Sequence, residues 1–74
     1  MFEHIDGHVA EFAKNQYGSY VVVTKGEGKY GPYIDAREYV SKDDYEGPTK
    51  KGLRLREDQV PLMIKYLERA LCEL

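Results

Sequence analysis

Apolar and polar residues alternate along much of the first 55 residues, which is the pattern of β-strands that bury one face. The pattern predicts a first strand over residues 8–14. Three of its residues should share one face, namely His8, Ala10 and Phe12. Turn-forming residues fill 15–19, and a β-branched and aromatic run predicts a second strand over 20–25. The glycines within 26–28 should end that strand and open a hairpin.

A third strand is predicted over residues 33–40, and its two faces differ in polarity. Its apolar face should carry Ile34, Ala36 and Val40, and its polar face Asp35, Arg37 and Tyr39. Glu38 falls on the apolar side, so we expect a β-bulge or a strong curl there. Residues 41–48 are polar and predict a loop, after which residues 53–55 form a short fourth strand.

The last 15 residues change to a spacing of three and four between apolar positions, which predicts an amphipathic helix. The recurring positions are Val60, Met63, Ile64, Leu67, Ala70, Leu71 and Leu74. Proline fits a helix only in its first turn, so Pro61 makes Asp58 the expected N-cap. The apolar surface is wider than one sheet contact needs, and we expect both the sheet and a partner to cover it. The predicted fold is α+β, with four antiparallel strands followed by one helix (ββββα).

The chain is small, with 74 residues and 8.6 kDa, and forms one domain over residues 1–74. Its only cysteine, Cys72, cannot form an internal disulfide, and two histidines with one cysteine cannot build a structural zinc site. Association with a second copy is then the expected source of stability. We expect a homodimer formed through the helix. The predicted interface residues are Leu62, Tyr66, Leu67 and Ala70.

The cellular setting expected from these features is intracellular, because a secreted domain of this size usually carries several disulfides. No apolar run approaches the roughly 20 residues that span a bilayer, so we expect no membrane contact. The corresponding compartments are the cytoplasm or nucleoid for a prokaryotic or viral protein and the nucleus for a eukaryotic one.

The formal net charge of −2 argues against a simple basic protein that coats nucleic acid, but it hides a local pattern. Residues 1–13 carry three acids and no lysine or arginine, whereas residues 47–56 carry four basic residues and no acid. Tyrosines are interleaved with the basic residues at Tyr17, Tyr20, Tyr30, Tyr33, Tyr39 and Tyr45. Cations beside flat rings are what single-stranded nucleic acid requires. From the residues alone, a solvated sheet face with tyrosines in the core remains the alternative.

Two motifs that resemble catalytic or cofactor sites have better structural explanations. Residues 26–31 match the dinucleotide fingerprint G-x-G-x-x-G, but Pro32 and a strand follow in place of a helix, so we predict a turn. His4 and His8 supply too few ligands for a metal site.

A small metal nuclease was the least favoured alternative. Its site would combine Glu27 and Lys29 with Asp6 or Glu11. Carboxylates from adjacent strands would have to converge there, and a solvated loop explains these residues better. We therefore expect no catalytic residue, no metal, no cofactor and no enzymatic activity.

Three segments resemble the transcriptional coactivator family called positive cofactor four. They are Ile-Asp-Ala-Arg-Glu-Tyr at 34–39, Pro-Thr-Lys-Lys-Gly-Leu-Arg-Leu at 48–55 and Glu-Asp-Gln at 57–59. The resemblance covers roughly residues 17–70. It implies a curved four-stranded antiparallel sheet followed by a helix, dimerisation through the helices, and paired channels for single-stranded DNA.

The resemblance also implies contact residues. Arg37 and Lys51 match family positions that contact DNA, and Lys50 matches a basic position next to that of Lys51. Lys25 and Lys29 flank a loop where the family also has cations. Tyr30 and Tyr39 are expected to offer their rings to bases. The sequence departs from the family at Val40 and at 27–28, where the family often has stacking aromatics. Each lost ring should weaken binding by about 1–3 kcal/mol.

The expected function is sequence-tolerant binding of single-stranded DNA by a homodimer, through a basic β-channel, in transcription, replication or repair. RNA and melted duplex are further candidate ligands, and transcription proteins are candidate partners. The alternative is a protein-interaction module of the transcription machinery with weak or no nucleic-acid binding. The acidic N-terminal residues and the missing aromatics favour this alternative slightly.

Overall fold

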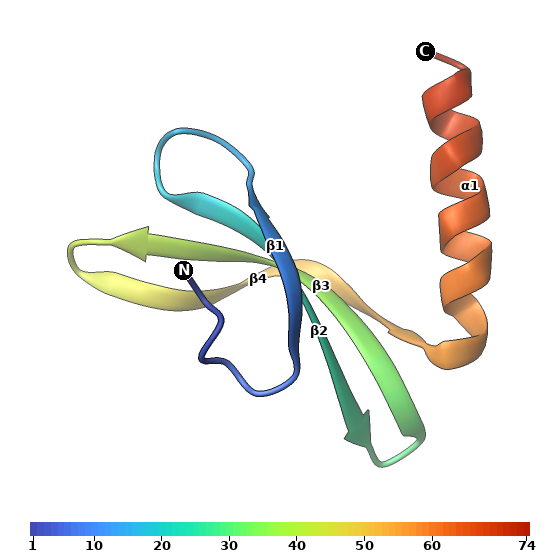
Figure 1. The fold of residues 1–74 in the computed structure, drawn as a ribbon, viewed down its shortest axis with the longest axis horizontal. Helices are drawn as coiled ribbons and strands as arrows, with labels where there is room; N and C mark the ends of the chain where they lie inside the picture. Colours follow the sequence, from blue (N-terminus) through green and yellow to red (C-terminus); the bar gives the residue numbers. More distant parts are fainter.

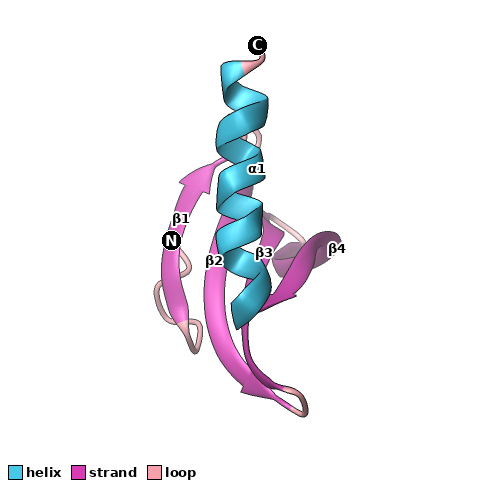
Figure 2. Cartoon of the chain, turned by 90° about the vertical axis from the view of Figure 1, so that its right-hand side faces the viewer, coloured by secondary structure: helices cyan, strands magenta, loops and turns pink.

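The computed structural model describes all 74 residues as a four-stranded antiparallel sheet followed by one helix, as the sequence predicts. The strands are β1 (His8–Ala13), β2 (Ser19–Gly28), β3 (Gly31–Lys42) and β4 (Tyr45–Arg56). They lie in the order β1-β2-β3-β4, so each strand pairs with its neighbour in sequence (Figure 1). A 3-10 turn, η1 (Glu57–Gln59), leads into α1 (Val60–Cys72). Figure 2 shows that the strands curve strongly along their length.

Three of the strands are longer than the sequence predicts, and β3 extends beyond the predicted residues 33–40 at both ends. β2 does not end at its glycines, and its pairing with β3 continues to the pair Gly28↔Gly31. At Gly26, a Cβ atom would lie 2.4 Å from the hydroxyl oxygen of Tyr33, so the glycine makes room for that ring. The loop predicted over residues 41–48 is wrong, because β4 starts at Tyr45 after a short turn. The pairing of β3 with β4 stabilises a polar segment that has little strand propensity of its own.

Pairing irregularities decide which face some residues occupy. Along β1, the register shifts between His8 and Ala10, so His8 does not share the face of Ala10 and Phe12 as predicted. Along β3, the register shifts between Arg37 and Tyr39, which confirms the irregularity expected at Glu38.

The sheet has one apolar and one polar face. We define the apolar face by residues that lie opposite one another in the pairing: Phe12, Val21, Val23, Ile34, Ala36, Leu53 and Leu55. The polar face is defined by Tyr20, Val22, Tyr33, Asp35, Arg37, Tyr39, Arg54 and Arg56. Three residues are buried in the chain, namely Phe2, Val22 and Asp35. None of them belongs to the apolar face.

The helix α1 stands beside the sheet and is joined to it through η1 (Figure 1). No residue of α1 is buried, and Leu67 is 61% exposed. The expectation that the sheet of the same chain covers the helix is therefore wrong. Only the three residues of η1 separate β4 from α1, so the chain has no loop with which to turn the helix back onto the sheet. With 13 residues, α1 is neither long nor apolar enough to cross a membrane.

The helix begins differently from the prediction. Gln59, and not Asp58, is the N-cap of α1, and Pro61 lies in the first helical turn. Proline is tolerated there because the N–H groups of the first turn have no acceptor within the helix. The side-chain oxygen of Gln59 accepts the N–H of Arg56 at 3.0 Å, which fixes the path from β4 into the helix.

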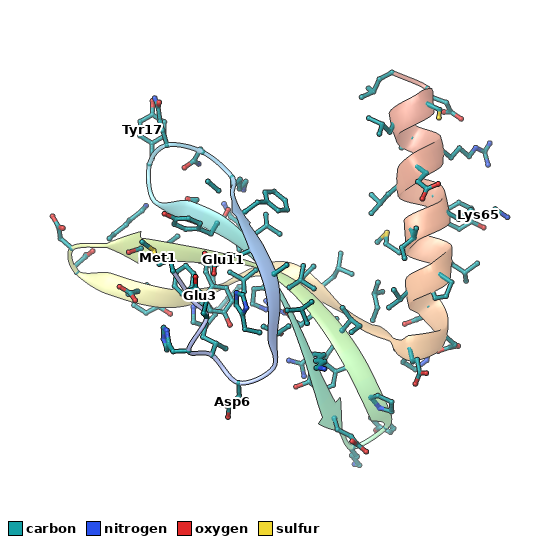
Figure 3. The ribbon with its side chains drawn as sticks, in the orientation of Figure 1. Met1, Glu3, Asp6, Glu11, Tyr17 and Lys65 are labelled. Atoms are coloured by element: carbon teal, nitrogen blue, oxygen red, sulfur yellow. The ribbon has the colours of Figure 1, made fainter.

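The segment before β1 crosses the polar face. The ring of Phe2 lies 5.6 Å from that of Tyr20 and 5.0 Å from that of Tyr39, and only 1% of Phe2 is exposed. Glu11 on β1 accepts the Phe2 N–H at 2.8 Å. In Figure 3, Met1, Glu3 and Glu11 gather where β1 passes over the sheet, and Asp6 points outward from the loop before β1.

Glu11 gives this segment a pH-dependent attachment. The hydrogen bond from the Phe2 N–H, together with contacts to the Met1 amino group and His8, lowers the pKa of Glu11 from 4.5 to about 2. A carboxyl whose pKa is lowered by folding stabilises the fold above its unfolded pKa, and this contribution is lost as the pH falls. Attachment of the segment should be complete above pH 4.5 and weaken towards pH 2.

We predict that the carboxyl carbon of Glu11 titrates near pH 2 when it is followed by NMR in the intact chain. Deletion of residues 1–7 removes the Phe2 donor, so the pKa of Glu11 should rise towards the ordinary value for glutamate. A midpoint near 4.5 in the intact chain would show that Phe2 is not held by this carboxylate.

Candidate nucleic-acid interface

A buried carboxylate organises the polar face. Asp35 on β3 is 4% exposed and lies directly opposite Arg54 on β4. One carboxylate oxygen accepts Nε of Arg37 at 3.1 Å, and the other accepts Nε of Arg54 at 3.1 Å. Arg37 also donates Nη2 to Asp35 at 3.3 Å and Nη1 to the carbonyl of Thr49 at 3.1 Å. A buried charge is costly unless paired, so Asp35 holds both guanidinium groups in fixed positions.

The basic residues of β4 continue this arrangement towards the helix. The guanidinium of Arg54 lies 3.9 Å from the centre of the Tyr33 ring, close enough for a cation–π contact. Arg56 is two residues further along the same strand and contacts Asp58 at 3.3 Å. Both arginine side chains remain more than half exposed. Arg37, Arg54 and Arg56 therefore form a row of cations along β3 and β4, and we call it the arginine row.

The β2–β3 turn adds a cation and a ring at the end of this row. A pocket of about 340 Å³ lies between the turn and the end of β4. Its lining includes Lys29, Tyr30, Tyr33, Arg54 and Arg56. Tyr30 is 85% exposed, and the ammonium of Lys29 lies 5.6 Å from the centre of its ring. Cations can bind a phosphate group and an accessible ring can stack on a base, so this pocket has the groups that one nucleotide requires.

The predicted site residues do not all lie together. Arg37 and Tyr39 are on the polar face, and Lys29 and Tyr30 reach the pocket at its end. Lys25 pairs with an apolar-face residue of β3 and is on the opposite side of the sheet.

Lys50 and Lys51 lie in the irregular part of β4 opposite Glu38. The pKa of Glu38 is lowered, chiefly by its hydrogen bond to Lys14 and further by the charges of Lys51 and Lys42. Part of the positive charge of Lys51 therefore acts on a carboxylate of the protein itself.

Sequence reasoning missed four members of this surface as site residues: Tyr33, Asp35, Arg54 and Arg56. The available signal was the spacing of two between Arg54 and Arg56, which places both on one face of a strand. The sequence predicts a fourth strand that ends at residue 55, which leaves Arg56 outside it. The strand in fact extends through Arg56.

The fold and the polar face define a class of protein: a small antiparallel sheet with arginines and tyrosines on one face, followed by an uncovered apolar helix. Comparison with protein families gives a match to Transcriptional Coactivator p15 (PC4) over residues 18–66, which is more than half of the chain. The chain belongs to this family of DNA-binding transcriptional coactivators, as the sequence resemblance indicates. Comparisons with curated proteins and with solved structures gave no match.

The matched residues define which parts of the chain are common to the family. They contain β2, β3, β4 and the first half of α1, and therefore the whole arginine row. Residues 1–17, with β1 and the segment that carries Phe2, lie before the match.

We predict that Asp35→Asn lowers the free energy of unfolding by about 1–3 kcal/mol, because two arginines lose a charged acceptor. The side-chain volume is kept, so no cavity forms. Urea unfolding followed by circular dichroism measures the effect. Asp44→Asn in the exposed β3–β4 turn is the control and should leave stability unchanged. Equal stability of the two variants would mean that Asp35 does not hold the arginine row.

Proposed function

We propose that this protein is a homodimer that binds single-stranded DNA with little sequence preference and without catalysis. The proposed setting is intracellular, at sites where duplex is opened in transcription, replication or repair. The arginine row is the observation that carries the proposal, because it combines fixed guanidinium groups with accessible rings on one face. Membership of a DNA-binding coactivator family supports the same function.

The proposed contacts divide by chemistry. Cations would hold the phosphates, and these are Arg37, Lys29, Lys50 and Lys51, joined by Arg54 and Arg56. Lys25 should contribute least, because it lies on the opposite face. Tyr30 and Tyr39 would stack on bases, which is tolerant of sequence because every base has a flat face. With a net charge of −2, binding must depend on these local groups and not on overall attraction.

A second copy of the chain would cover its uncovered apolar surfaces. Leu62, Tyr66 and Leu67 of α1 are each at least half exposed, and Ala70 lies on the same side of the helix. The largest hollow, about 640 Å³, lies between the β2–β3 hairpin and the helix start, and its lining includes Ile34. A chain with three buried residues has too small a core to be stable alone. The helix and the apolar face are therefore the proposed dimer interface.

The exposed helix also favours a second candidate function, a protein-interaction module that binds transcription proteins. The two functions would use different surfaces, because α1 stands apart from β3 and β4, the strands that carry the arginine row (Figure 1). Removal of cations from the polar face should abolish DNA binding and leave a protein contact through the helix intact.

We predict that the chain binds a labelled single-stranded oligonucleotide and prefers it to a blunt duplex of the same sequence. Fluorescence anisotropy at two salt concentrations should give a slope of log affinity against log salt of about −4, since six cations would each neutralise one phosphate at about −0.7. No binding at low salt, or equal affinity for the duplex, would exclude the proposed function.

Single-charge variants then test the site. Arg37→Ala and Lys51→Ala should each weaken binding and reduce the magnitude of the slope by about 0.7. Lys65→Ala is the matched control, because Lys65 projects from the helix (Figure 3) and its loss removes the same charge. A control as harmful as the two site variants would mean that total charge, and not the polar face, governs binding.

We predict that the protein sediments at twice 8.6 kDa and that its thermal midpoint rises with protein concentration. Leu67→Ala should shift the equilibrium towards monomer, since it removes exposed apolar surface from the proposed interface. Glu68→Ala, on the other side of the helix, is the control. A monomer mass with a concentration-independent midpoint would rule out the dimer.

A further inference from the structure

Two tyrosines form an aromatic pair on the polar face, beside the arginine row. Tyr20 on β2 and Tyr39 on β3 lie directly opposite one another in the strand pairing. The next pair on the same face is Val22 with Arg37, whose guanidinium is held by Asp35 and by the carbonyl of Thr49 on β4. Rings on a sheet face that also carries fixed cations are a combination that binds a base and its phosphate.

The side chain of Phe2 already occupies this aromatic pair. Its ring meets Tyr20 edge to face, at an interplanar angle of 74°, and lies tilted on Tyr39. Phe2 is 1% exposed, whereas the two tyrosines on which it packs are half-buried. Phe2 therefore covers two rings that a nucleobase would need to contact on this face.

We propose that Tyr20 and Tyr39 form a base-binding site and that Phe2 fills it in the free protein, so that residues 1–7 compete with single-stranded nucleic acid for the polar face. This inference rests on the proposed function and adds a binding residue, Tyr20, and a built-in competitor.

Residues 1–7 are attached to the sheet at few points, as a segment that can be displaced by a ligand must be. At its far end, the carbonyl of Gly7 accepts the N–H of Lys25 at 2.9 Å, and Gly7 has a φ of +77°, where a side chain would be strained. Between Gly7 and Phe2 the backbone hydrogen bonds are internal to the segment, from Ile5 N–H to the Phe2 carbonyl and from His8 N–H to the Ile5 carbonyl. A cavity of about 290 Å³ lies between this segment and the end of the β3–β4 hairpin, and its lining includes His4 and Tyr39. The segment is thus attached to the sheet at its two ends, by Phe2 with the Met1 amino group and by Gly7.

Charge also makes joint occupancy unfavourable. Residues 1–13 carry three carboxylates and no lysine or arginine, so the segment and β1 have the same sign as a phosphate backbone. The segment lies outside the residues matched to the family, whereas Tyr20 and Tyr39 lie inside them. The proposed competitor therefore lies outside the matched family domain, and the site that it fills lies within it.

Fluorine NMR of the intact chain tests the proposal directly. The chain has two phenylalanines, so labelling with 4-fluorophenylalanine gives one signal for Phe2 and one for Phe12. In the DNA-free protein, a soluble paramagnetic agent should spare the signal of Phe2, which is 1% exposed. Saturation with oligothymidylate should move the Phe2 signal and make it sensitive to the agent. A Phe2 signal that stays protected while the oligonucleotide is bound would overturn the inference and leave the proposed function standing.

Affinity measurements provide the second test. Phe2→Ala should raise the affinity for oligothymidylate about tenfold. This is the change expected if Phe2 fills the site in about 90% of the free molecules, because only the remaining tenth can then bind the ligand. Tyr17→Ala, which removes an exposed ring from the turn between β1 and β2, is the control and should leave the affinity unchanged. A folded Phe2→Ala protein with equal or weaker affinity would overturn the inference. If that variant does not fold, the fluorine measurement decides. Absence of binding by the intact chain and by both variants would instead refute the proposed function.

Discussion

The buried carboxylate of Asp35 is the interaction on which the polar face depends. It lies in the middle of β3, where a charge without partners would destabilise the sheet, and it is neutralised by arginines from β3 and β4. The same contacts fix two long side chains that would otherwise lose much conformational freedom on binding a ligand. Stability and preorganisation of the candidate site therefore have one physical cause.

The second constraint is the small amount of apolar surface that one chain can bury. Its apolar sheet face and its helix are both uncovered, and η1 is too short to bring them together. Three residues are buried in the chain, and the two apolar ones, Phe2 and Val22, lie on the polar side of the sheet. Part of the polar face therefore forms the core of the single chain, whereas the apolar face stays exposed and is available to a partner. This division explains why assembly and ligand binding are proposed on opposite sides of the sheet.

Periodicity predicted much of the fold, since each strand and the helix carry their own pattern. The alternation in β3 placed Asp35, Arg37 and Tyr39 on one face, and the misplaced Glu38 marked the irregularity that the pairing contains. The pattern failed where neighbours override local preference. β4 extends over a polar stretch because β3 offers it a hydrogen-bonding edge, and His8 changes face because of a shift that alternation cannot reveal.

The sequence by itself determined the fold class, the family and the two-sided character of the sheet, because these follow from the spacing of residues along single elements and from short motifs. Only the tertiary structure decided which cations gather, since Arg54 meets Asp35 through strand pairing and Lys25 is turned to the other side. It alone also placed Phe2 on Tyr20 and Tyr39. Contacts between residues distant in the chain depend on register and on the path of the backbone, and neither is encoded in the local pattern of any one segment.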